Sequence, residues 1–434
     1  MIMKLGYRTI TLIIFFICIS FQNFAQTKFK VESLSFEGLK KTKASFLTRI
    51  AKVKAGQETD SVVVITDIER IKRLDGIAFA SYTVKKNGDA YDITYTVKEN
   101  FSIIPGVRTG EANDGSFLYR VSAFEFNGLG RNIIFGGFFK REVFNGFGVF
   151  LEHPYLFSNK LGLGVNYVDD TSQQPIFFDP NDINNSANYA YTRRGPELTL
   201  FYELNFKNRF ELGSKVFKEE YTLINDDPEN EGFGDVPQPQ LNKALFRASH
   251  EYVDVDIQYQ NQSGFRNFID VNYFVGGEGA LQTEYIINST TQFYKLIGSK
   301  GNFATQLKLQ ISNTVNNTAF VPITIDNQFN NRGVGNTVDR GISSTTLNTE
   351  YRHTLLEKGW FVLQGNLFTD ISSLQRPDAQ FGDQFSSDTF RVYSGVGVRF
   401  IHKYIFNAVL RFDYGVNIAG TGANGFVFGI GQFF

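Results

Sequence analysis

The chain has 434 residues, of which 42% are hydrophobic and 15% aromatic, yet its mean hydropathy is only -0.18, so polar residues are mixed in throughout. This excludes a helical membrane protein, because no apolar run after the start approaches the ~20 residues that a spanning helix needs, whereas a spanning strand needs only ~10, half of them apolar. The net charge of -1 gives no electrostatic footprint for nucleic acid, which is therefore not an expected partner.

Residues 1–25 are typical of a secretory signal peptide. Lysine and arginine precede an apolar run over 10–21, and Ala25 supplies a plausible cleavage point. A run of roughly a dozen residues is too short to span a membrane, which argues against the alternative of an anchor. Cys18, the only cysteine, lies in this run. We therefore expect a mature chain without a thiol, a disulfide or a cysteine metal site.

Residues 27–100 are predicted to form a small α+β domain in the order strand, helix, helix, strand, strand. Asp60 is expected to cap the second helix, and Asn87-Gly88 is the pair favoured by a type I′ turn. The turn would join strands over 80–86 and 90–98, and the apolar positions that define the first strand and the helices are Val31, Leu34, Phe36, Phe46, Leu47, Ile50, Val53, Ile65, Ile68, Ile71 and Leu74.

This order of elements resembles a POTRA domain, the periplasmic module that precedes a family of outer-membrane barrels. Such domains are thought to receive an incoming extended chain by strand addition at an exposed sheet edge, which is the function that the resemblance implies. The residues leave open the alternative of a simple plug or spacer.

Residues 101–434 show the period of two that is typical of strands. In 197–206 and 303–312, apolar side chains alternate with polar ones, which gives one face to lipid and one to a polar interior. A soluble lipocalin-type barrel has the reverse arrangement. We therefore predict a mainly β fold, a transmembrane antiparallel β-barrel of about 16 strands behind the small domain. The strands are expected over 101–110, 116–127, 131–141, 144–153, 160–168, 195–206, 208–219, 243–259, 264–276, 286–298, 301–313, 344–353, 360–371, 391–401, 404–415 and 424–434.

Four long polar connections, 169–194, 220–242, 314–343 and 372–390, all follow odd-numbered strands. With the small domain in the periplasm the first strand runs outward, so these connections are external and the short turns are periplasmic, as the rule for outer-membrane barrels requires. We therefore expect the cell outer membrane as the location, with membrane lipids around the barrel and the N-terminal domain in the periplasm.

The last predicted strand is amphipathic and ends on an aromatic residue. Its apolar positions resemble the C-terminal signal by which the barrel-assembly machinery recognises its clients; the alternative is an ordinary closing strand. Glycines in this strand would pack little and weaken its pairing, which is consistent with a soft seam between the first and last strands. The signal residues are Phe426, Phe428, Ile430 and Phe434, and the glycines are Gly425, Gly429 and Gly431.

The stretch "FNNRGVGNTVDRG" before the twelfth strand resembles the sixth external loop of BamA, TamA and FhaC-type translocators, in which an aliphatic residue, Arg, Gly and an aromatic residue form a motif. Arg332 and Gly333 match it. The next two strands place Glu350 and Asp370 where that family has acidic residues. The sequence departs from the pattern at three positions: Asn331 replaces the aliphatic residue, Val334 the aromatic one, and Ser372 the glycine after Asp370.

Strand parity supports a contact between these residues independently. If Leu347 and Leu367 point outward, Glu350 and Asp370 face the lumen on neighbouring strands. An external loop folded into the barrel would bring Arg332 near them, where its guanidinium can hold a carboxylate. We call this expected contact the loop lock. The alternative is that all three are wet lumen charges, each worth under ~1 kcal/mol.

The resemblance implies insertion of outer-membrane proteins or translocation of polypeptide across the outer membrane. Its implied partners are unfolded outer-membrane or secreted polypeptides and accessory periplasmic or lipoprotein factors. The alternative is a passive channel or structural barrel. A barrel enzyme is not favoured, because none of the histidines has an evident Ser and acidic partner, and no cofactor or metal motif is recognisable. These histidines are His153, His250, His353 and His402.

Overall fold

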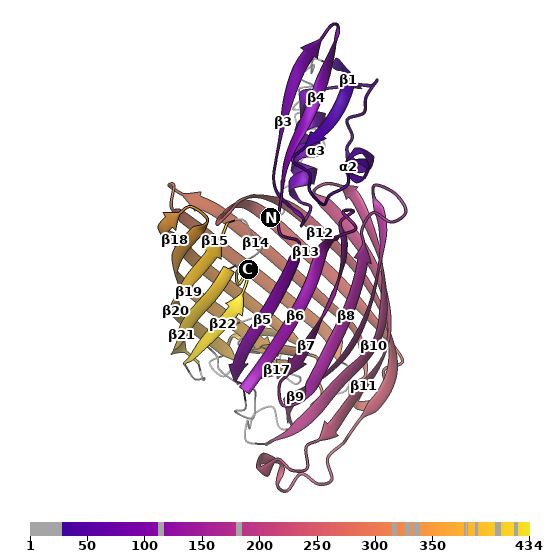
Figure 1. The fold of residues 1–434 in the computed structure, drawn as a ribbon. Helices are drawn as coiled ribbons and strands as arrows, with labels where there is room; N and C mark the ends of the chain where they lie inside the picture. Colours follow the sequence, from indigo (N-terminus) through magenta and orange to yellow (C-terminus); the bar gives the residue numbers. More distant parts are fainter. Residues whose placement is uncertain are drawn as a thin grey trace, which may run out of the picture.

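A computed structural model describes residues 28–111, 117–178, 185–314, 319–325, 331–333, 339–376, 379, 381–386, 389–403, 409–420 and 424–434. The predicted signal peptide, residues 1–25, and Val334 lie outside the described residues. Two parts are seen: a small α+β head and a sixteen-stranded barrel, with the head standing at one end of the barrel (Figure 1). Among the described helices, none is both long and apolar enough to cross a membrane.

The head is a four-stranded sheet backed by two helices. Its strand order is β2-β1-β4-β3, in which β1 runs parallel to β4 and the other neighbours are antiparallel. Asp60 caps the second helix as predicted, since its side chain accepts a hydrogen bond from the amide of Val63. The elements are β1 (Phe29–Glu37), α2 (Ala44–Ile50), β2 (Glu58–Thr59), α3 (Ser61–Lys72), β3 (Ile77–Asn87) and β4 (Ala90–Glu99).

Three details of the head differ from the sequence-based expectation. The two-residue strand β2 between the helices is not predicted. Ile65 is 47% exposed, because the buried face of α3 is offset by one residue and begins at Val64. The hairpin turn is also shifted by one residue: Asn87 pairs with Ala90, so the loop is Gly88-Asp89. Gly88 has φ +60°, and Asp89 is not among the residues with positive φ. A glycine at the first central position fits a type II′ turn rather than the expected type I′.

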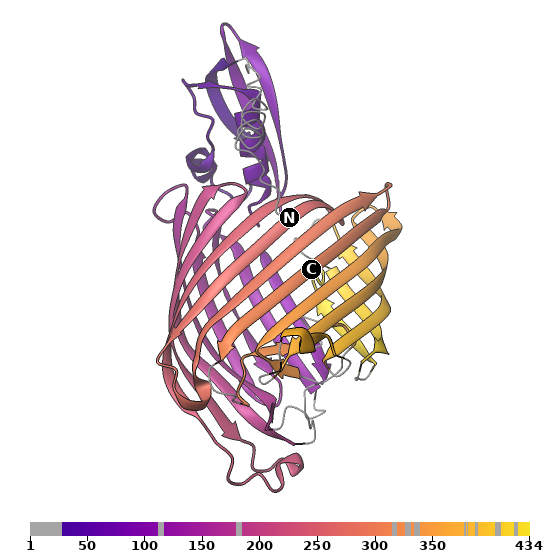
Figure 2. The ribbon, with the colours of Figure 1, turned by 180° about the vertical axis from the view of Figure 1, so that it is seen from behind.

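The barrel is one antiparallel sheet of sixteen strands, and it confirms the predicted strand count. Each predicted strand corresponds to one observed strand. Figure 2 shows the far wall, where the strands run continuously at a steep tilt. The strands are β5 (Ile103–Glu111), β6 (Phe117–Gly128), β7 (Ile133–Arg141), β8 (Asn145–His153), β9 (Leu161–Phe177), β10 (Ser186–Asn205), β11 (Asn208–Leu223), β12 (Gln240–Gln258), β13 (Asn261–Val275), β14 (Thr283–Ile297), β15 (Gly301–Thr314), β18 (Ser343–Lys358), β19 (Phe361–Gln375), β20 (Phe390–His402), β21 (Val409–Ala419) and β22 (Gly425–Ile430).

The predicted long connections lie at the end of the barrel opposite the head, and one of them is largely strand. Most of 169–194 extends β9 and β10 into a hairpin that projects from that end (Figure 1). An apolar cluster stabilises this projection, so the strands continue past the barrel wall; it contains Ile176, Tyr189, Tyr221, Leu223, Leu281 and Phe320. Short 3-10 turns η1 (Pro228–Asn230), η2 (Gly279–Leu281) and η3 (Phe381–Phe385) lie in the other connections.

The barrel wall has an apolar outside and a polar inside, as the alternation predicted. Leu307 and Leu367 are exposed on the outer surface, whereas Gln306 and Asn366 on the same strands are buried in the lumen. Because every backbone group in a spanning strand needs a partner, a nearly closed barrel is one of the few structures that can cross a bilayer. The molecule therefore has the construction of an outer-membrane barrel.

Candidate functional site

The connection between β15 and β18 crosses the lumen, and we call it the lumenal loop; its described residues are 319–325, 331–333 and 339–342. Its two ends form the short ladder β16 (Ile323–Ile325) and β17 (Asp339–Gly341). Arg340 fixes this ladder to the β9–β11 wall, since its guanidinium donates to the side chains of Gln174 and Tyr221. Phe320 packs against the ring of Tyr221 at 4.8 Å. The ladder also packs on the wall that holds the tip, since Ile323 and Ile325 cluster with Leu374 of β19. The loop therefore contacts both sides of the lumen.

At the tip, the structure brings Arg332 together with both predicted carboxylates. The Arg332 guanidinium donates to Asp370 through Nε at 2.9 Å and Nη2 at 2.8 Å, and through Nη1 to Glu350 at 2.5 Å. The Arg332 main-chain amide also donates to Asp370, at 2.9 Å. All three side chains are fully buried. The geometry is the bidentate fork that favours arginine over lysine.

Four residues that the sequence reasoning did not single out as site residues complete a charged cluster around this contact. Arg352 and Arg399 donate to Glu350, and Arg399 also pairs with Asp413 at 3.2 Å. Arg411 lies 3.5 Å from Asp413. Strand parity could have found these residues, because the exposed Val398, Phe400, Leu410 and Phe412 alternate with them.

This cluster, which we call the lumen cluster, consists of Arg332, Glu350, Arg352, Asp370, Arg399, Arg411 and Asp413. Buried charges are tolerated only when they are paired and hydrogen-bonded. Removing one member strands its partners, at a cost of ~3–5 kcal/mol, whereas a wet surface pair is worth under ~1 kcal/mol. The burial of this set therefore supports the loop lock over the alternative of wet lumen charges.

Two departures from the family motif compensate for one another. The side-chain amide of Asn331 donates to the hydroxyl of Ser372 at 2.5 Å, and both residues are buried. These are the positions at which an aliphatic residue and a glycine were expected. This hydrogen bond joins the tip to β19.

Glycines let the loop tip approach the last two strands. A Cβ on Gly415 would lie 2.3 Å from the main-chain oxygen of Arg332, and one on Gly425 would lie 3.3 Å from that of Gly333. Gly333 itself has φ +98°. Gly425, predicted as a weak point of the seam, thus has a packing role: it provides room for the tip. Gly429 similarly leaves room for the Arg411 side chain, whose Nη2 would lie 2.7 Å from an added Cβ.

The final strand is shorter than predicted. β22 ends at Ile430, and Gly431, with φ +96°, turns residues 431–434 away from the strand and into the lumen. Phe426 is 80% exposed on the outer face of β22, whereas the main-chain oxygen of Phe434 accepts a hydrogen bond from buried Arg352 at 2.7 Å. Phe434 therefore does not continue the outward row of the predicted signal, and Gly431 lies outside the last strand.

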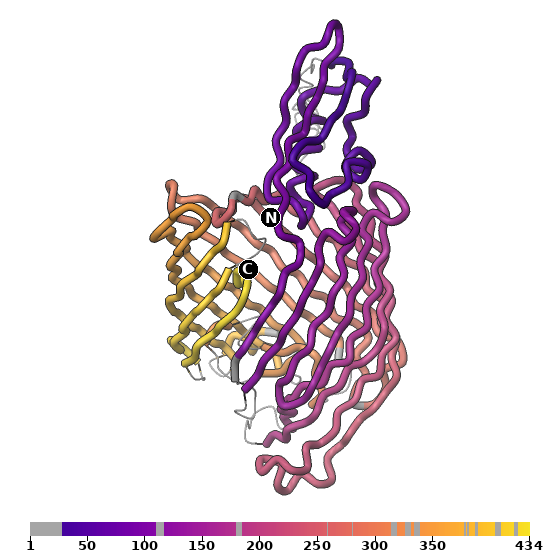
Figure 3. The backbone as a smooth tube through the Cα atoms, in the orientation of Figure 1, coloured from indigo at the N-terminus to yellow at the C-terminus, as the bar shows by residue number. Residues whose placement is uncertain are grey.

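The two ends of the sheet meet at a seam. β5 pairs with β6 and β22 with β21, and within the described residues no ladder joins β5 to β22. The two strands nevertheless lie side by side, as Figures 1 and 3 show. The seam therefore leaves two strand edges whose backbone groups are not joined in a sheet, in a barrel that is otherwise fully laddered.

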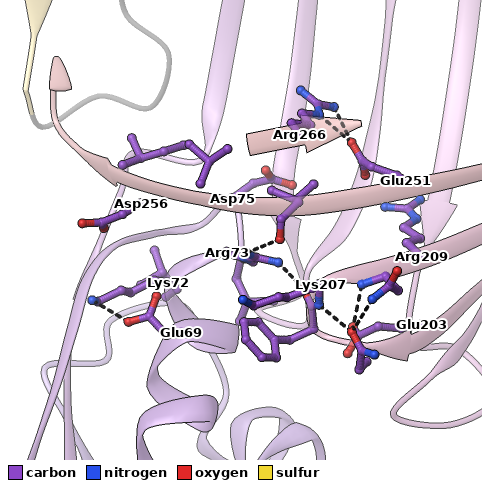
Figure 4. Close-up of a pocket in the computed structure, with 18 of the residues that line it drawn as sticks. Glu69, Lys72, Arg73, Asp75, Glu203, Lys207, Arg209, Glu251, Asp256 and Arg266 are labelled. Carbon is purple, nitrogen blue, oxygen red and sulfur yellow. Dashed lines mark hydrogen bonds and ion pairs between the residues drawn. The ribbon is translucent and has the colours of Figure 1, made fainter. Parts of the chain in front are cut away.

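A second candidate site lies at the junction of the head and the barrel. Arg73 of the head donates to the main-chain oxygens of Phe206, in the turn after β10, and Val253 of β12, and Arg70 pairs with Glu203. Arg73 and Glu203 line a cavity at this junction, and Figure 4 shows them among its other charged side chains. The cavity has a volume of about 400 Å³. The head is thus held against the barrel by arginine contacts rather than by the connecting chain alone.

Asp75 lines this junction cavity, and burial raises the pKa of its carboxyl to about 6. The folded protein therefore binds this proton more tightly than the unfolded chain, whose aspartate pKa is near 3.8. The protonated Asp75 carboxyl makes its full contribution to the stability of the fold below pH ~4, and this contribution is lost as the pH rises through about 6. At pH values above 6, we expect Asp75→Asn to increase the free energy of unfolding of the head by roughly 1–3 kcal/mol. The change is seen as a higher melting temperature.

This difference between Asp75→Asn and wild type should close as the pH falls from 6 to about 4. Circular dichroism at the helical wavelength can follow it, because both described α-helices belong to the head. Asp89→Asn, the same substitution in an exposed turn, is the control. Equal melting curves for Asp75→Asn and wild type at pH 7.5 would show that the junction does not bury the carboxylate.

Three of the four histidines contact a neighbouring polar or aromatic side chain. His250 lies 2.9 Å from the amide oxygen of Asn208, and His353 lies 3.0 Å from the hydroxyl of Tyr351. His402 stacks on Trp360. In the described part of the chain, no group of three or more His, Cys, Asp or Glu side chains is placed to hold a metal ion.

The fold and the lumen cluster define a class: a sixteen-stranded barrel of the outer-membrane type with a loop bound inside it. Solved structures of outer-membrane barrels are similar to the chain in fold. BamA from Haemophilus ducreyi lacking POTRA domains 1–3 has 16% sequence identity and a TM-score of 0.55, with 93% of this chain and 84% of that chain covered.

CdiB from Acinetobacter baumannii has 13% identity and a TM-score of 0.60, with 93% of this chain and 74% of that chain covered. CdiB from Escherichia coli has 13% identity and a TM-score of 0.64, covering 92% and 76%. The chain therefore has the fold of the BamA and CdiB barrels, as the sequence resemblance predicted. No protein-family model and no curated protein matches the sequence.

Proposed function

We propose that this chain is a member of the outer-membrane superfamily that includes BamA and CdiB, and that it inserts outer-membrane proteins or translocates polypeptide across the outer membrane. The observation that carries the proposal is the seam. β5 and β22 lie side by side without a ladder between them in the described residues. An incoming polypeptide strand can pair with such an edge, which is the physical basis of strand addition.

The lumenal loop supports the same proposal. It crosses from Arg340 on one wall to Arg332 on the other, so the lumen is obstructed at rest. A passive pore does not require a loop fixed inside it by buried charges. A translocator requires a loop that closes the lumen and moves aside when a client polypeptide passes. The barrel works by pairing and gating rather than by covalent chemistry, and it needs no cofactor.

We assign the head to the periplasm, as a single POTRA-like domain spanning 27–100. Its position at the end of the barrel with the short turns supports this assignment. Edge strand β3 is mostly exposed beyond Ala80, so it is available to an extended client chain before the client reaches the barrel. The expected partners are unfolded polypeptides, membrane lipids and accessory periplasmic or lipoprotein factors.

Site-specific photo-crosslinking in living cells tests the seam. A photoreactive residue at Val107, which is exposed on β5, should capture newly made polypeptides as they pair with the strand edge. The matched control is Val216 on β11, which is also exposed on the outer face but lies in the laddered wall. We expect the yield of client adducts at Val107 to be roughly tenfold higher than at Val216, because only the strand edge is open to pairing. Identical adducts at both positions would instead favour the alternative, a passive channel or structural barrel.

A further inference from the structure

Residues 431–434, which we call the inward segment, contact every arginine of the lumen cluster. The ring of Phe433 lies 4.3 Å from the guanidinium carbon of Arg332 and 4.9 Å from that of Arg411. The side-chain oxygen of Gln432 accepts a hydrogen bond from Arg399 at 2.9 Å. Phe434 accepts one from Arg352 through its main-chain oxygen, at 2.7 Å. The segment is therefore bound to the same charges that hold the loop tip.

Arg332 lies between two aromatic rings. Phe368 of β19 lies 3.8 Å from its guanidinium carbon, and Phe433 lies at 4.3 Å. Phe368 belongs to a strand in the middle of the wall, so it cannot move without breaking ladders on both sides. Phe433 belongs to a segment that continues β22, the strand at the seam, and that lies beyond the end of its ladder. The second ring therefore links the loop tip to β22, one of the two strands that have no ladder partner on one side within the described residues.

We propose that Phe433 is a positioning residue: it holds Arg332 in the lumen cluster and couples withdrawal of the loop tip to release of the inward segment, and of the end of β22 that carries it, from the lumen cluster. The proposal rests on the proposed gating function. The physical reason is that a stacked cation and ring in a dry site stabilise each other, so loss of either weakens the placement of the other. Coupling of this kind is reciprocal, because each side affects the other by the same free energy.

Hydrogen exchange of the whole protein, purified from outer membranes, tests this reciprocity without any client. Phe433→Leu keeps an apolar side chain but removes the ring face. We expect exchange to rise about tenfold in peptides that contain Asn331–Gly333, and Phe433→Tyr, which keeps the ring, to restore protection. Phe426→Leu, at the 80% exposed position of β22, is the matched control and should leave the loop peptides unchanged.

The reverse measurement uses Arg332→Ala and reads peptides from β22 and the inward segment, which should also exchange about tenfold faster. It keeps the proposal testable where Phe433→Leu fails to fold. The proposal is overturned if Phe433→Leu resembles Phe426→Leu at the loop tip, if Phe433→Tyr is as unprotected as Phe433→Leu, or if Arg332→Ala leaves residues 425–434 protected. These outcomes are independent of client capture at Val107, so the coupling and the proposed function fail separately.

Discussion

Arg332→Ala is expected to convert a mostly closed barrel into one that opens frequently or permanently in planar bilayers. The substitution removes three side-chain hydrogen bonds to Asp370 and Glu350 and leaves two buried carboxylates short of a partner. Stranding buried charges costs ~3–5 kcal/mol, which is enough to release the loop tip from the cluster. A conductance recording of wild type beside the variant measures the result directly.

Arg266→Ala is the matched control for this experiment. Arg266 also faces the lumen and pairs with Glu251, but its side chain is 47% exposed, so we expect an effect under ~1 kcal/mol and unchanged gating. A variant that lacks residues 27–100 separates the contribution of the head. If wild type, Arg332→Ala and the headless variant all form the same steady pore, the loop lock is wrong and a passive channel is the better description.

Gly415→Ala is expected to release the loop tip without changing any charge. Its added Cβ would lie 2.3 Å from the main-chain oxygen of Arg332 and 2.9 Å from Gly333 Cα, both backbone atoms that cannot rotate away. The tip must therefore move off β21, and the bidentate contact with Asp370 is lost with it. We expect frequent openings like those of Arg332→Ala, with a destabilisation of ~1–3 kcal/mol from overpacking.

Gly365→Ala is the control for the glycine experiment. It makes the same substitution on the nearby strand β19, where the added Cβ meets only the end of the Leu355 side chain at 3.2 Å and that side chain can yield. Its conductance should match wild type. Closed, wild-type-like traces for Gly415→Ala would show that the tip does not depend on this contact, even if the arginine result holds.

The Arg332→Ala and Gly415→Ala experiments test two different ways of releasing the loop tip. Arg332→Ala removes the attraction that holds the tip, whereas Gly415→Ala fills the space that the tip occupies. Because the tip contacts β21 and β22 at the seam, both changes are expected to act on the strand edge to which a client would bind. A shared gating phenotype would connect the charge cluster, the glycines and the seam in one mechanism.

The sequence by itself determined the sixteen strands and, in the strands with clear alternation, which side chains face the lumen. Period-two alternation is local, since a strand of about ten residues carries its own lipid face and lumen face. The same parity placed Glu350 and Asp370 in the lumen, and the family resemblance supplied Arg332 as their partner. Local propensity also predicted both helices and three of the four strands of the head, with an error of one residue in the face of α3 and in the hairpin turn.

The tertiary structure alone decided what meets across the lumen. Strand parity places Arg352, Arg399 and Arg411 inside, but their convergence on Glu350 and Asp413 depends on the register of four neighbouring strands. The inward turn at Gly431 is not visible in alternation, because a single positive φ reverses a segment that would otherwise continue the strand. Contacts between residues far apart in the chain arise from closure of the barrel, and no local pattern encodes them.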